Sequence, residues 1–269
     1  MTGPERVSLY RAPTTAADAD ALADWLRDRV DATVDVRDRF LDGAAERGAA
    51  DADAADADGA GSLAREFARA RVLSPHDRET GNEMLGIVRY EQRALADPER
   101  GGGVLYDGLA VQDALRERLP ADERGLDHAH VVLTDRVLGS WGEHDGRWHK
   151  RVCVLGQPAL VSVPGLYEAP AKPEAYYKAK QRHAMLSGDA PPREVLEEQV
   201  EGEFLVAEDP RTTEALRGSV LAAVHYLATG EAFCDDESCA LYNAHHQEDL
   251  VAAQLREPLL CPTHAERYG

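Results

Sequence analysis

Short segments with a hydrophobic period of two alternate along the chain with longer segments of helical period. The period of two predicts strands at residues 7–10, 32–37, 130–139, 148–157 and 159–168. The helical period predicts helices at residues 21–30, 62–73, 111–119, 173–186, 212–230 and 246–255, while 84–95 is ambiguous. The strand-helix-strand opening indicates α/β layering, and the strand-rich middle indicates a mixed or antiparallel portion of the sheet. The sequence therefore predicts one α/β domain with a mixed sheet (α+β) over residues 1–269.

Breaks in the pattern divide these elements. Residues 48–62 contain only Ala, Asp, Gly and Ser, so they have no large apolar side chain to bury, and we expect a disordered surface insertion. The GGG at 101–103 has neither the Lys-Ser/Thr of a phosphate loop nor the spacing of a dinucleotide fingerprint, which leaves a turn. A Thr-x-x-Glu-like start and Gly230 supply cap signals for the helix at 212–230.

The excess of acidic residues bears on which kinds of molecule the protein could bind. The chain has 49 acidic and 30 basic residues and a formal charge of -19, which disfavours binding to nucleic acid and to anionic membranes. The acids are spread from Asp18 to Glu266 instead of forming one block, which favours the salt-adapted surface of a halophilic archaeal protein over an acidic docking face. No apolar run approaches the roughly 20 residues of a membrane span, and the N-terminus lacks the apolar region of a signal peptide. We expect a cytoplasmic protein.

Three of the four cysteines lie close together near the C-terminus. Cys234 and Cys239 have four residues between them, and Cys261 is followed three residues later by His264. Two close pairs separated by a loop suit tetrahedral zinc, because each pair can converge on one metal ion from a tight turn. The alternative is that the thiols are small buried side chains beside an unrelated histidine.

Four protein ligands would leave no open coordination position, so the spacing predicts a structural Zn²⁺ that stabilises residues 230–269. His245 or His246, inside the loop, could replace His264 as the fourth ligand. Cys153 falls on an apolar strand and is expected to be a core side chain.

This C-terminal pattern resembles that of the archaemetzincins, a family of zinc metallopeptidases. In that family Cys-x4-Cys-x-Met and a downstream Cys-x-x-Cys complete a structural zinc site. Here Cys234 and Cys239 match the first pair, Leu241 takes the Met position, and Cys261 with His264 matches the second pair, with His in place of the final Cys. Residues 133–168 are similar to the family's strands before the active-site helix. The resemblance implies a metzincin-like second half, and the N-terminal half has no match.

The family's catalytic motif, His-Glu-x-x-His-x-x-Gly-x-x-His, ends immediately before the first of these cysteines. Alignment on the cysteine places Ala223, Leu227 and Phe233 at the three zinc-ligand positions and Val224 at the general base, and only Gly230 is kept. Apolar side chains can neither hold a metal nor accept a proton from metal-bound water. The resemblance therefore implies a metallopeptidase relative whose peptidase site is degenerate and which has no catalytic residue at these positions. Its cleft would bind a protein or peptide.

Two alternatives remain open. The protein could be an active metal-dependent hydrolase with relocated ligands, among them His225 with His128 or His130, or an unrelated zinc-stabilised protein-binding module. His128 and His130 alternate on a predicted strand and share a face, where Asp127 or His149 could supply a third ligand for a second metal. Solvated or hydrogen-bonded histidines are the alternative to this second site.

Overall fold

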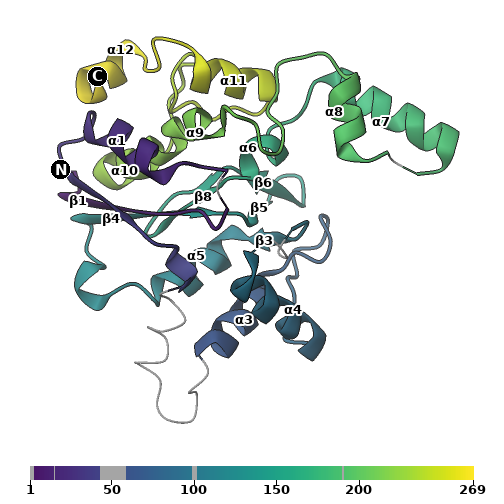
Figure 1. Ribbon diagram of the computed structural model, residues 1–269, viewed down its shortest axis with the longest axis horizontal. Coiled ribbons are helices and arrows are strands. Elements are labelled where there is room, and N and C mark those ends of the chain that lie inside the picture. The colour runs from purple at the N-terminus through teal and green to yellow at the C-terminus, as the bar shows by residue number, and fades with distance from the viewer. Residues whose placement is uncertain (1–2, 15, 43–58, 99–101, 190) are drawn as a thin grey trace.

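A five-stranded sheet runs through the centre of the protein (Figure 1). The computed structural model describes residues 3–14, 16–42, 59–98, 102–189 and 191–269. The strand order is β2-β1-β4-β8-β7. The strands are β1 (Arg6–Tyr10), β2 (Thr33–Arg37), β4 (His128–Thr134), β7 (Cys153–Val154) and β8 (Ala159–Ser162). All neighbours pair in parallel except β7, which pairs antiparallel with β8. The predicted mixed α/β architecture is confirmed.

A second, three-stranded sheet extends from the same central segment of the chain. Its order is β3-β5-β6, built from β3 (Leu105–Asp107), β5 (Val137–Gly142) and β6 (Arg147–Arg151). The β5–β6 hairpin is antiparallel, and β3 lies parallel to β5. The alternating pattern predicts one strand over residues 130–139, but the strand breaks at Asp135 and Arg136, where the chain passes from one sheet to the other. Alternation alone does not reveal such a break, because both strands are apolar.

Helices cover both faces of the five-stranded sheet, which explains why all seven residues of β4 are buried. One face carries α1 (Ala19–Arg27), α9 (Thr212–Ala215) and α10 (Arg217–Thr229), with α11 (Gln247–Leu255) and α12 (Pro262–Tyr268) beyond them (Figure 1). The other carries α3 (Gly59–Ala70) and α5 (Gly108–Arg116), with α4 (Leu85–Ala96) against α3. Alternate residues of β1 and β4 enter the two cores: Val7, Leu9, Ala129 and Val131 on the α10 face, and Tyr10 and Val132 on the α5 face.

A helical hairpin projects from this layered body. It consists of α7 (Glu174–Ser187) and α8 (Arg193–Gln199) and stands away from both sheets (Figure 1). Three large apolar side chains of α7 are exposed, namely Tyr177, Met185 and Leu186. The remaining short helices are α6 (Gly165–Glu168), after β8, and the 3₁₀ turn η2 (Ala121–Glu123), before β4.

Local capping accounts for several helix boundaries. Asp18 caps α1 by accepting from the backbone N–H of Ala21 at 3.0 Å. Gly230 ends α10 in the left-handed conformation with φ 80°, as the sequence predicts. The predicted helix at 212–230 is not continuous, however, because it divides into α9 and α10 at Leu216. Thr212 does not cap it, since its hydroxyl donates to the carbonyl of Asp209 at 2.6 Å.

Of the predicted insertion at 48–62, residues 48–58 lie outside the described residues, and residues 59–62 form the first turn of α3. That part of the prediction is wrong because the buried apolar side chains further along α3, Leu63 and Phe67, stabilise the helix as a whole, its first turn included. The ambiguous segment at 84–95 is the helix α4. Gly103 lies in a turn with φ 79°, as expected. Among the described residues, no helix is long and apolar enough to cross a membrane.

A fully buried carboxylate joins α4 to the smaller sheet. Glu91 has no exposed surface, and its oxygens accept from Arg136 at 3.2 Å, Arg71 at 3.3 Å and the Tyr106 hydroxyl at 3.1 Å. Burial raises the pKa of Glu91, and the two guanidinium groups oppose that shift. Because a buried charge is tolerated only when it is paired, this group fixes how α4 and β3 pack.

Candidate metal centre

Two turns position the cysteine pairs beside each other. Cys234 and Cys239 lie in the loop after α10, where the Cys234 N–H donates to the Leu241 carbonyl at 2.9 Å. Cys261 is the N-cap of α12, and His264 lies in the first turn of that helix, which Pro262 starts. The Ala240 N–H donates to the Leu259 carbonyl at 2.8 Å and ties the two turns together.

The four candidate ligand atoms lie within 4.8 Å of one another. Cys234 Sγ is 3.9 Å from Cys261 Sγ, and His264 Nδ1 is 3.6 Å from Cys239 Sγ and 3.2 Å from Cys261 Sγ. A tetrahedral zinc ion with bonds of about 2.3 Å to sulfur and about 2.0 Å to nitrogen sets its ligands about 3.8 Å (S···S) and about 3.5 Å (S···N) apart. The donor set and its spacing therefore fit one metal ion.

Burial favours the neutral, protonated form of the thiols in this cluster when no cation is bound. Cys239 is fully buried and Cys261 is 5% exposed. Burial chiefly raises the pKa of both the Cys234 and the Cys239 thiol. The thiolate is the form that ligates metal, so a divalent cation is the group that can hold these sulfurs in their charged form.

His245 and His246 do not join the cluster. His246 is exposed and approaches Asp249 at 3.3 Å, and His245 is also exposed. The structure brings His264, and neither of these two histidines, to the three sulfur atoms. Cys153 also lies apart: it packs against the main core, and burial raises its pKa to about 11, as expected for a core thiol.

The positions aligned with a catalytic zinc site lie on α10 and just after it. Ala223 and Val224 are buried in the core under the helix, Leu227 is partly buried, and Phe233 is 42% exposed. His225, on the same helix, is buried, and its Nδ1 lies 2.9 Å from the Tyr268 hydroxyl. Its ring meets that of His264 edge-on at 5.0 Å, so it packs against this candidate ligand without joining the cluster.

The relocated-ligand alternative, in which His225 shares a metal with His128 or His130, is wrong on geometry. The α10 helix packs on the sheet face formed by Ala129 and Val131. Because side chains alternate along a strand, His128 and His130 point to the opposite face. The sheet therefore separates His225 from both strand histidines.

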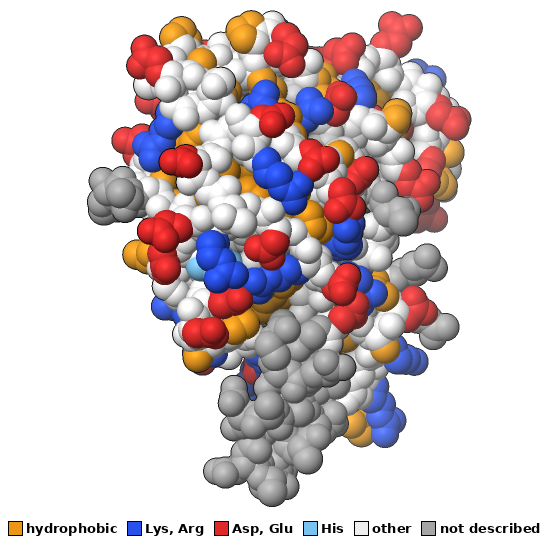
Figure 2. Space-filling model, turned by 60° about the vertical axis from the view of Figure 1, so that its left-hand side comes forward, with side chains coloured by type: hydrophobic (Ala, Val, Ile, Leu, Met, Phe, Trp, Pro, Cys, Tyr) orange, Lys and Arg blue, Asp and Glu red, His pale blue; other side chains and the backbone are white. Residues whose placement is uncertain are grey.

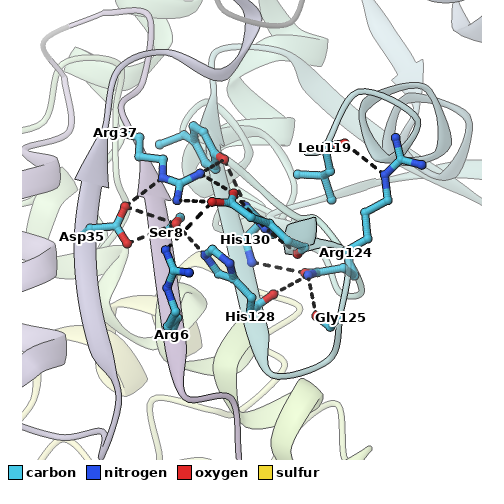
Figure 3. A network of polar contacts seen from close by, with 12 residues as sticks. Arg6, Ser8, Asp35, Arg37, Leu119, Arg124, Gly125, His128 and His130 are labelled. Carbon is cyan, nitrogen blue, oxygen red and sulfur yellow. Dashed lines mark hydrogen bonds and ion pairs between the residues drawn. The ribbon is translucent and has the colours of Figure 1, made fainter. Parts of the chain in front are cut away.

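His128 and His130 do form a second cluster, with Glu123 as the third group (Figure 3). Their rings stack 4.2 Å apart on one face of β4, as the alternation predicts. The suggested third ligands, Asp127 and His149, are not part of it, and His149 instead lies 2.9 Å from Asp145. The sequence did not indicate Glu123 as a member of this cluster. It joins the histidines only because η2 folds back against the strand, and no local sequence pattern predicts that fold.

The polar groups of this second cluster are already hydrogen-bonded or ion-paired to other residues (Figure 3). Arg37 holds Glu123 in a bidentate pair at 2.6 and 2.9 Å. His130 Nδ1 is 3.0 Å from the Tyr10 hydroxyl and its Nε2 is 3.0 Å from the Glu123 carbonyl, while His128 Nε2 is 2.8 Å from Ser8 Oγ. Both nitrogens of His130 are thus used, and the arrangement is that of a hydrogen-bonded polar network in the core.

Acidification should destabilise the fold through His130. Burial lowers the pKa of His130 from 6.5 to about 4, so the unfolded chain binds the proton first. The free energy of unfolding should therefore fall as the pH drops through 6.5 and stop falling near 4. Between pH 8 and pH 5 this residue alone accounts for about 2 kcal/mol. In urea unfolding, the free energy of unfolding of His130→Asn should change by about 2 kcal/mol less than that of the wild type over this pH range. The control His144→Asn, at an exposed position, should show the same pH dependence as the wild type. Equal pH dependence in all three proteins would contradict this.

Comparison with known proteins gives no functional name. No curated protein matches the chain. Among solved structures, the crystal structure of archaemetzincin from Methanopyrus kandleri is similar, with a TM-score of 0.43 and 13% identity, over 98% of this chain and 92% of that chain. A family model described as a family of unknown function (DUF7001) matches residues 8–267. Since that match spans nearly the whole sequence, the chain belongs to this family of unknown function.

Proposed function

We propose that the protein is a zinc-stabilised relative of the archaemetzincins that has lost peptidase chemistry and acts by binding a protein or peptide. The observation that carries the proposal is the contrast within one short segment. Four ligand atoms converge at residues 234–264, while the three positions that would hold a catalytic metal beside them are Ala223, Leu227 and Phe233.

The zinc ion is structural in this proposal because Cys234, Cys239, Cys261 and His264 fill a tetrahedral shell. When bound, the ion would crosslink the turn after α10 to the start of α12 and neutralise the buried thiolates. The protein side chains supply the rest of the stability, since Leu259, Leu260 and Tyr268 pack into the main core beside the site. The cysteine spacing, and not the overall superposition, supports the relationship to the archaemetzincins.

A protein or peptide partner is favoured over nucleic acid by the charge of the surface. Figure 2 shows acidic and basic side chains interspersed over one face, without a basic patch there, and the chain carries a formal charge of -19. The exposed Tyr177, Met185 and Leu186 of α7 offer apolar contact area on the projecting hairpin. The excess of acids also supports a salt-adapted, archaeal, cytoplasmic protein.

Metal content tests the proposal. Elemental analysis of the full chain purified in high salt should give one zinc per chain, and Cys153→Ser should keep it. The same preparation should cleave no peptide in a library of mixed sequence. Two zinc ions per chain together with zinc-dependent cleavage would overturn the proposal in favour of an active hydrolase.

A further inference from the structure

A cleft of about 720 Å³ opens where three parallel strands of the main sheet end. Asp135 and Val163, which directly follow β4 and β8, line it, and so does Thr14, four residues after the end of β1. From β1 the chain passes to β2 on one side, while the strands of this sheet that follow β4, namely β7 and β8, lie on the other side. Connections that leave in opposite directions open a crevice at the carboxyl ends of the strands, which is where open α/β sheets bind ligands.

Asp135 lies at this crevice with one carboxylate oxygen unused. Its Oδ1 accepts from the Thr14 hydroxyl at 3.4 Å, and its Oδ2 is buried without a hydrogen-bond partner among the described residues. Two cations lie near enough to act on its charge, namely Arg136, which pairs with Glu91, and Arg39, which pairs with Asp42 at 2.8 Å and whose Nε is buried without a hydrogen-bond partner among the described residues. A buried oxygen without a partner is uncommon in native proteins and asks for a ligand, a water molecule or a proton.

Glu208, across the cleft from the strand ends, is held in an unusual backbone conformation. Its φ is 58°, the only positive value among the non-glycine residues described. Such a conformation is strained for a residue that carries a Cβ, and it recurs at binding sites. The next residue, Asp209, is satisfied internally, because Arg211 donates to it from its backbone N–H at 2.9 Å and from its guanidinium. Glu208 is exposed and thus presents its carboxylate at the rim.

The rest of the lining is apolar or neutral. Val163, Pro164, Pro210 and the ring of Tyr167 form the walls, and no Lys, Arg or His is part of the described lining. Burial chiefly raises the pKa of the Tyr167 hydroxyl, and the charge of Asp135 is among those that add to the shift, so the two groups lie near each other. Arg193 approaches the Tyr167 ring at 4.8 Å but is paired with Glu168 at 3.2 Å.

We propose that this cleft binds the primary ammonium group of an alkylamine, with Asp135 as the counter-ion at the floor, Glu208 as a second carboxylate at the rim and Tyr167 against the alkyl chain. A carboxylate with a free oxygen accepts an N⁺–H donor, and an aromatic ring favours a cation and its methylene groups. The site is distinct from the zinc cluster and does not depend on it, so the inference goes beyond the proposed function.

Calorimetric titration of the zinc-loaded full chain with 1,4-diaminobutane tests this site. We expect saturable binding at one site per chain and at least tenfold weaker binding of butane-1,4-diol, which has the same length without the charge. Asp135→Asn should weaken diamine binding at least tenfold and Glu208→Gln two- to fivefold. Asp122→Asn, an exposed acid on η2, controls for general attraction to an acidic surface and should bind as the wild type does.

A second variant keeps the test decisive if Asp135→Asn does not fold. Ala207 is exposed and lines the cleft, so Ala207→Trp should block diamine binding while both carboxylates remain, with zinc content and circular dichroism unchanged. Absence of saturable diamine binding to the wild type, or equal loss in Asp122→Asn and Asp135→Asn, would overturn the proposal. Because zinc content is measured in every sample, failure here is distinguishable from failure of the proposed function.

Discussion

Cys261→Ser is expected to release the zinc ion and to destabilise the C-terminal segment from the end of α10 onward. Structural zinc in small modules has an apparent binding free energy of about 10–16 kcal/mol, as large as the total stability of a typical domain, about 5–15 kcal/mol. Part of that energy is offset here because Leu259, Leu260 and Tyr268 still pack into the core. We therefore expect a loss of at least about 5 kcal/mol in the free energy of unfolding, measured by urea denaturation alongside elemental analysis.

Cys153→Ser is the matched control, since it removes a core thiol outside the cluster. It should retain one zinc per chain and lose about 1 kcal/mol or less, as expected for a small change of a buried side chain. A chelator should give the wild type the same urea unfolding curve as Cys261→Ser. It should not change the curve of Cys261→Ser itself. If Cys261→Ser kept a full complement of zinc and wild-type stability, the four-ligand site would be wrong.

Glu91→Gln should cost about 3–5 kcal/mol, because it leaves the buried Arg136 and the partly buried Arg71 without their shared counter-charge. Glu83→Gln is the control: its carboxylate pairs with Arg69 at the surface and should be worth less than about 1 kcal/mol. Urea unfolding in high salt measures both, since salt screens the exposed pair more than the buried one.

The double variant Glu91→Leu with Arg136→Met distinguishes the net contribution of the ion pair to stability from the cost of leaving one partner unpaired. Apolar groups of similar volume often replace a buried pair at little cost. The double variant should therefore be more stable than Glu91→Gln. Equal losses for Glu91→Gln and Glu83→Gln would show that water reaches Glu91.

Sequence reasoning worked where the information is local. The convergence of Cys234, Cys239, Cys261 and His264 was predicted from two short spacings, because a close pair on a turn converges whatever the rest of the chain does. The shared face of His128 and His130 was predicted for a similar reason, since alternation in a strand is a property of the backbone.

Contacts between segments that are far apart in the sequence could not be predicted. Glu123 reaches the strand histidines only because η2 folds back, and Arg37 reaches Glu123 from β2, 86 residues away. Asp135 was hidden inside what reads as one apolar strand. The break at Asp135 and the cleft it lines arise from the order in which parallel strands assemble, and hydrophobic periodicity carries no information on that order.

The projecting hairpin has a practical consequence for experiments on this acidic protein. The chain contains four lysines, of which Lys172 is buried and Lys150 is paired with Glu168. The other two, Lys178 and Lys180, are exposed on α7. Amine-reactive fluorophores, cross-linkers and biosensor surfaces should therefore attach at this hairpin, and also at the α-amino group and at Lys150, whose side chain is 40% exposed.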